Sequence, residues 1–200
     1  SDKRCLDSVL HSLARGVGMQ VKYARLAEDY SNPTLKKAFE LLTLARIAHK
    51  VCSVNPVGLP LGAAVSPKKF KALLADIGLM QKLCGMPVDV EYAKTDLLAI
   101  FRGAMAEQFV GQEALTAGQE LYYWSREAKS SSAEVDFLLS IDGKIVQVEV
   151  KSSAAGRLRS LHLLLNSCTA CPEAYVFSGA PCAELPEQKL TFLPLYYAYS

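Results

Sequence analysis

The sequence predicts an α/β protein in which a small, mostly helical module precedes a mixed sheet flanked by helices. Residues 5–45 carry apolar side chains at helical spacing, residues 121–150 alternate apolar and polar side chains as strands do, and a broadly apolar helix lies between them. The chain has 200 residues, of which 50% are hydrophobic and 21% are charged. This globular composition and length allow one large domain or two of roughly 100 residues each.

The first module is expected to hold three short helices followed by a hairpin. Residues 5–15 form the first helix and residues 23–30 the second, while Asn32-Pro33 supplies an N-cap and an early proline for the third. Residues 45–58 are typical of a strand, whereas residues 66–80 fit either a second strand or a helix. This order is that of a winged helix-turn-helix, in which the helix after the turn contacts DNA.

Lysines of this module are the charges available to DNA phosphates. Small winged modules also serve as protein linkers, and lysines often only solvate a surface. The net charge of +2 neither demands nor excludes a nucleic-acid partner. The lysines concerned are Lys36, Lys37, Lys68, Lys69 and Lys71.

The second region is expected to follow the order helix, three strands, helix, two strands. Residues 84–96 interrupt the pattern with Gly, Pro and acidic residues, which predicts a division into domains 1–84 and 85–200. The predicted helices are 96–117 and 158–166, and the predicted strands are 121–125, 134–140, 144–150, 174–178 and 190–197.

An Asp-Gly pair at 142–143 predicts a two-residue hairpin loop between the second and third of these strands. The resulting register places Asp136 opposite Glu149 and Glu134 opposite Lys151. Residues directly opposite each other share one face of the sheet, with Cβ atoms about 5 Å apart. The turn is therefore expected to gather these charged side chains into one polar cluster.

Two carboxylates at that separation repel by roughly 3 kcal/mol at an effective dielectric constant of 20. Lys151, solvent, protonation of one carboxylate or a bound cation would offset this cost. Oxygen ligands of this kind suit Mg²⁺ or Mn²⁺, beside which Lys151 would orient a water or stabilise transition-state charge. Glu107, from the preceding helix, would add a third carboxylate. The alternative is a solvated sheet face with ordinary Glu-Lys pairs.

The motifs "EVDF" and "VEVKSS", with Glu107 upstream in "AMAEQFVGQEAL", resemble the PD-(D/E)XK nuclease superfamily. Through "KKFKALLADIGL", "GAMAEQFVGQEAL", "LYYWSREAKSSSAEVDFLL" and "VEVKSS", the chain as a whole is similar to the C-terminal region of a group of prokaryotic AAA-type ATPases, a domain of unknown function. The resemblance implies a restriction-endonuclease-like fold in the second half. Carried over by motif, Asp136 and Glu149 would be metal ligands, Lys151 the catalytic lysine and Glu107 the helix-borne acid.

The resemblance also implies partners. This chain has no G-x-x-x-x-G-K-[ST] motif and so does not contain the ATPase module of those proteins. The resemblance implies that such a module would lie N-terminal to Ser1. Arg157 and Arg159, near the expected cluster, would contact DNA phosphates. No run reaches the roughly 18 apolar residues of a membrane helix, and the six cysteines are expected as reduced thiols, so a cytoplasmic protein is expected.

Three functions remain open. The first is a metal-dependent DNA phosphodiesterase. The second is a non-catalytic module with a nuclease-like fold, which binds nucleic acid or protein and regulates the attached ATPase. The third is a DNA-binding regulator led by the winged helix, whose binding would weaken steeply with salt.

Overall fold

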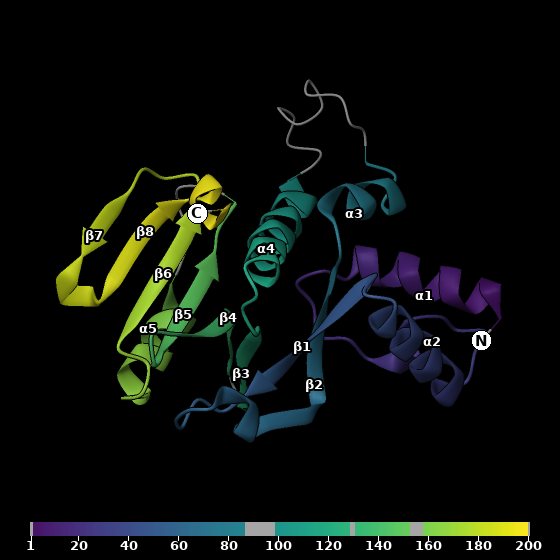
Figure 1. The fold of residues 1–200 in the computed structure, drawn as a ribbon, viewed down its shortest axis with the longest axis horizontal. Coiled ribbons are helices and arrows are strands. Elements are labelled where there is room, and N and C mark those ends of the chain that lie inside the picture. Colours follow the sequence, from purple (N-terminus) through teal and green to yellow (C-terminus); the bar gives the residue numbers. More distant parts are fainter. Residues whose placement is uncertain (1, 87–98, 129–130, 153–157, 200) are drawn as a thin grey trace. The chain divides into compact units, whose positions relative to one another are not determined.

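A computed structural model describes residues 2–86, 99–128, 131–152 and 158–199 (Figure 1). In this part of the chain the protein is α/β, with five α-helices and one mixed sheet of eight strands in the order β2-β1-β3-β4-β5-β6-β8-β7. The predicted fold class is confirmed. No helix among these residues is long and apolar enough to cross a membrane.

The first and third predicted helices are present. Helix α1 spans Lys3–Arg15 and begins where the Asp2 side chain accepts a hydrogen bond from the Arg4 backbone N–H. Helix α2 spans Asn32–Leu44. The predicted helix at 23–30 is wrong in extent, because only a 3₁₀ turn, η1 (Tyr23–Arg25), forms there. So short a segment does not repay the cost of helix nucleation by itself.

The segment that fitted either a strand or a helix contains both. Strand β2 spans Val65–Leu74 and helix α3 spans Ile77–Leu83, with Asp76 between them accepting a hydrogen bond from the Leu79 N–H. Strand β1 (Ala48–Val54) neighbours β2 and also pairs in parallel with β3. The predicted hairpin is therefore the edge of the large sheet.

The second region follows the predicted order, with one additional short strand, β7. Helix α4 (Ala99–Thr116) precedes the strands, and helix α5 (Arg159–Ser167) separates β5 from β6. The strands are β3 (Tyr122–Ala128), β4 (Ser131–Ile141), β5 (Lys144–Val150), β6 (Glu173–Ser178), β7 (Ala183–Leu185) and β8 (Leu190–Pro194).

The chain forms two compact units. Unit 1 comprises Ser1–Val51 and Lys69–Gln108, and unit 2 comprises Cys52–Lys68 and Phe109–Ser200. Strands β1 and β2 and helix α4 each begin in one unit and end in the other. The predicted division into domains 1–84 and 85–200 stays a prediction.

Strand alternation explains how unit 2 buries both faces of its sheet. On one face, Leu138 of β4 belongs to a buried cluster with Leu161 of α5. On the other face, Phe137 and Val148 share an apolar hollow of about 240 Å³ with Val110 of α4. Neighbouring residues of the hairpin thus serve opposite faces.

Half-buried His49, on β1, provides a pH test of unit 1. Burial lowers the pKa of its imidazole, and the positive charge of Arg46 lowers it further. The folded protein therefore binds this proton more weakly than the unfolded chain, so stability is lost as the pH falls from 6.5 through the folded-state pKa. Between about pH 7 and about pH 5, the His49→Gln variant is expected to lose less free energy of unfolding than the unsubstituted chain does. Urea unfolding at each pH measures this, and equal losses would contradict it.

Candidate functional site

The hairpin that carries the candidate site has the predicted turn and register. Asp142 and Gly143 adopt φ values of 49° and 74°, the positive values that a two-residue type I′ loop requires. The paired residues of β4 and β5 are Phe137/Val148, Leu138/Gln147, Leu139/Val146, Ser140/Ile145 and Ile141/Lys144. The side-chain faces of the two strands are therefore those expected from the Asp-Gly pair.

Asp136 lies where the strand pairing becomes irregular. Tyr122 of β3 pairs with Leu138, but Trp124, two residues later, pairs with Val135, three residues earlier on β4. The extra residue in β4 is a β-bulge beside Asp136, a feature that re-aims side chains and is frequent near active sites. The Asp136 carboxylate accepts a hydrogen bond of 2.8 Å from the Val150 N–H, through Oδ2.

Glu149 and Lys151 are in direct contact on β5 and just beyond it. Lys151 Nζ lies 2.5 Å from Glu149 Oε1 and donates a hydrogen bond to it. Glu149 is only 6% exposed, whereas the Lys151 side chain is 28% exposed. The Asp136 hydrogen bond to Val150 brings the second carboxylate to the backbone between these two residues. The structure thus gathers Asp136, Glu149 and Lys151 at one end of β5.

The face of β5 that carries Glu149 is not solvated. Gln147, two residues earlier on this face, is fully buried, and neither its amide oxygen nor its amide nitrogen has a hydrogen-bond partner in the described part of the chain. A solvated face with ordinary Glu-Lys pairs is therefore wrong for this strand. Burying polar groups costs free energy unless they are paired, so such groups call for a structural or functional reason. The alternation in "VQVEVK" predicts that Gln147 lies on the same face of β5 as Glu149.

Glu107 has a different, well-defined environment in unit 1. Its Oε1 lies 2.9 Å from Lys71 Nζ, in an ion pair whose side chains are 12% and 2% exposed. The adjacent Gln108, which sequence reasoning missed, is fully buried and exchanges two hydrogen bonds with the backbone of Leu74 on β2. The Asp136–Glu149–Lys151 cluster belongs to unit 2, so the predicted role of Glu107 beside it stays a prediction.

The expectation that Lys71 contacts DNA is wrong. Lys71 is one of the last five residues of β2, all of which are buried, and its ammonium forms an ion pair with Glu107. A buried ammonium cannot reach a DNA phosphate. A lysine between phenylalanine and alanine, in the run "KFKALL", was the available signal for a buried position.

The other predicted DNA contacts stay predictions. Lys36 and Lys37 are exposed on α2, and Lys36 lies 3.7 Å from Glu40. Lys68 is exposed on β2, whereas Lys69 is half-buried. Arg159 is exposed at the first residue of α5. Arg157 lies outside the described residues.

The residues present fit a hard divalent cation. Asp136 and Glu149 offer carboxylate oxygens, the ligands that Mg²⁺ and Mn²⁺ prefer, and Mg²⁺ commonly takes only one or two protein carboxylates. Within the residues that the structure describes, no group of three or more His, Cys, Asp or Glu side chains forms a metal site. A site here would therefore use two carboxylates and complete its coordination with water or substrate oxygens.

Comparison with known families assigns each half of the chain. Residues 1–89 match the Domain of unknown function (DUF8612), and residues 102–196 match the Domain of unknown function (DUF4143). The chain carries a DUF8612 and a DUF4143 domain. The DUF4143 match contains the whole hairpin with Asp136, Glu149 and Lys151. Neither domain has a named function.

The crystal structure of protein VC1899 from Vibrio cholerae is similar to the chain. It is 13% identical in sequence, and the match covers 97% of this chain and 49% of that one with a TM-score of 0.33. The chain thus spans about half the length of VC1899. None of the curated proteins matches the chain.

Proposed function

We propose that the DUF4143 domain is a Mg²⁺- or Mn²⁺-dependent phosphodiesterase of the PD-(D/E)XK type that acts on DNA, in a cytoplasmic protein that also carries an N-terminal ATPase module. The observation that carries the proposal is the buried carboxylate of Glu149, which Lys151 contacts at 2.5 Å beside the bulge at Asp136. Three of the four residues that the nuclease-like motif assigns, Asp136, Glu149 and Lys151, are those of this cluster, which supports the proposal.

Each residue has a distinct role in this proposal. Asp136 and Glu149 would hold the cation, and Val150 keeps Asp136 in place through its N–H. The cation would supply a Lewis acid for the phosphodiester oxygens and a more acidic water. Lys151, already a hydrogen-bond donor in this cluster, would orient the attacking water or stabilise negative charge on the phosphoryl oxygens. Glu107 is proposed as the additional acid of the family pattern.

The test is nicking of supercoiled plasmid with Mg²⁺, Mn²⁺ or EDTA. Lys151→Met and Asp136→Asn are expected to reduce the cleavage rate about 100-fold or more, since each removes a group that acts in the reaction. Lys144→Met is the matched control, because Lys144 lies at the start of β5, is exposed and pairs with Glu173 at 3.6 Å. Cleavage by Lys151→Met at the control's rate, with both proteins folded by circular dichroism, would overturn the proposal.

A non-catalytic module is the second candidate. The observation that favours it is that Lys151 and the carboxylates of Glu149 and Asp136 already take part in contacts within the chain. This alternative expects DNA or protein binding without cleavage, and unchanged binding after Glu149→Gln. Anisotropy of a labelled DNA duplex, measured in EDTA and then with Mg²⁺, separates binding from cleavage in the same sample.

A further inference from the structure

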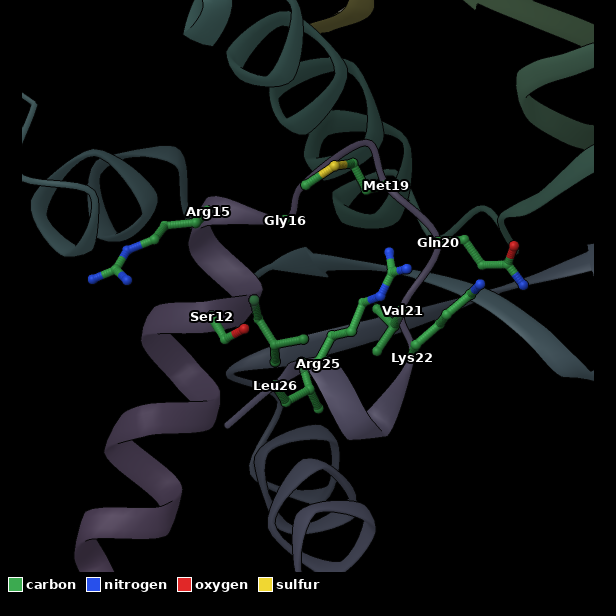
Figure 2. Close-up of a pocket in the computed structure, with 10 residues that line it drawn as sticks. Ser12, Arg15, Gly16, Met19, Gln20, Val21, Lys22, Arg25 and Leu26 are labelled. Atoms are coloured by element: carbon green, nitrogen blue, oxygen red, sulfur yellow. The ribbon is translucent and has the colours of Figure 1, made fainter. Parts of the chain in front are cut away.

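Unit 1 contains a hollow of about 440 Å³ that one continuous stretch of chain lines (Figure 2). The stretch runs from Ser12, near the end of α1, through a glycine-containing turn to η1 and Leu26. It belongs to unit 1, whereas the hairpin of the candidate site belongs to unit 2. It needs an explanation of its own.

The hollow is positively charged and has no acidic residue in its wall. Arg15, Lys22 and Arg25 line it, and the sequence has no Asp or Glu between Asp7 and Glu28. None of the three cations forms an ion pair within the described residues. In a chain whose overall charge is only +2, this is a local excess of uncompensated positive charge.

Two of these cations are directed alike. Figure 2 shows Arg25 and Lys22 extending in the same direction, toward the turn that carries Met19 and Gln20, whereas Arg15 points the other way. The charge of Arg15 instead lowers the pKa of the Cys84 thiol, against the larger rise that burial causes. An anion bound by both cations would offset the repulsion between their like charges.

Three contacts hold the chain segment that lines the hollow. The Val21 N–H donates a hydrogen bond of 2.8 Å to the Phe70 carbonyl, and the Tyr23 ring of η1 packs 5.5 Å from the Phe70 ring. Gly18, at a φ of +82°, lies so close to Glu107 that a Cβ there would be 2.7 Å from Oε2. The turn and η1 are therefore held in place before any ligand arrives, which reduces the entropic cost of binding.

The donors that face the hollow match a phosphate group. A guanidinium offers two parallel N–H groups to two phosphate oxygens, and an ammonium adds a compact charge. Leu13, Met19 and Leu26 supply apolar wall beside these donors, which suits the base of a nucleotide. Glu107 does not neutralise the site, because its charge is matched by Lys71.

We propose that this hollow binds a phosphate group, with Arg25 and Lys22 as its ligands. The phosphate belongs either to a free nucleotide or to a nucleic-acid chain. The hollow belongs to unit 1, and the proposal does not require that Asp136, Glu149 or Lys151 of unit 2 be active.

The test uses the full chain in EDTA, so that no cleavage occurs. Three probes are titrated: inorganic phosphate and AMP by calorimetry, and a short fluorescein-labelled DNA duplex by anisotropy. Arg25→Gln is expected to weaken binding about tenfold, the effect of losing one charge-assisted interaction. Lys82→Gln is the matched control, because it removes the same charge from an exposed position on α3. Lys22→Gln provides a second variant if Arg25→Gln does not fold.

The outcomes separate the two sources. Arg25-dependent binding of phosphate and AMP identifies a nucleotide site, whereas Arg25-dependent binding of the duplex alone identifies a nucleic-acid contact. The proposal is overturned if no probe binds, or if Arg25→Gln and Lys82→Gln weaken every probe equally. Lys144→Met, at an exposed residue of β5 that belongs to neither proposed site, is expected to bind every probe as the unsubstituted chain does. The test measures binding in EDTA and not cleavage, so failure of the cleavage proposal leaves this result readable.

Discussion

Lys71→Met is expected to lower the free energy of unfolding by about 3–5 kcal/mol. The substitution takes the ammonium of Lys71 away from the buried carboxylate of Glu107, and removing one partner of a buried ion pair is strongly destabilising. The double variant Lys71→Met/Glu107→Leu is expected to recover most of this loss, because a buried ion pair adds little over apolar residues of similar volume. Urea unfolding followed by circular dichroism measures the free energy of unfolding of both variants and of the unsubstituted chain.

Lys68→Met is the control for this experiment, since Lys68 is exposed on the same strand. It is expected to change stability by less than about 0.5 kcal/mol. A loss below about 1 kcal/mol for Lys71→Met would contradict the buried pair. Glu107→Gln is expected to lower stability as well, because it takes the carboxylate away from the buried ammonium of Lys71.

Phe137→Ala is expected to cost about 3–5 kcal/mol of stability. Phe137 is 1% exposed, pairs with Val148 across the hairpin and lines the apolar hollow that it shares with α4. Truncation removes buried apolar surface and leaves a cavity that the paired strands cannot close. Fluorescence of Trp124, the chain's single tryptophan, reports the unfolding of unit 2 directly.

Ile141→Ala is the control for Phe137→Ala, because Ile141 lies on the same face of the same strand and is 38% exposed. Its loss is expected to be well below that of Phe137, since less of its surface leaves water on folding. Equal losses from the two variants would mean that the apolar face of the hairpin is not the core of unit 2.

The hairpin was predictable because its signals are local. Asp142-Gly143 favours a two-residue loop on backbone grounds, and a side-chain period of two then assigns every residue of β4 and β5 to a face. The order of helices and strands after residue 99 was predictable for the same reason. The bulge at Asp136 was not, because it depends on how β3 pairs with β4.

Other features depended on contacts between distant segments. The predicted helix at 23–30 forms only the turn η1. Tyr23 of this turn packs against Phe39 and Phe70, which lie far from it in the sequence. Lys71 looked like a surface charge because nothing near it in the chain shows that Glu107, 36 residues later, lies against it. Buried charges are rare enough that the exposed alternative was the reasonable expectation.

The candidate site, too, was predictable only in part. The motif and the turn were enough to predict Asp136, Glu149 and Lys151 and their place in the hairpin, because turn geometry and strand alternation act over a few residues. Whether the face with Glu149 is dry or solvated was decided by the packing of the sheet, which leaves Gln147 fully buried and Glu149 6% exposed. Burial is a property of what covers a strand, and the covering segments come from elsewhere in the chain.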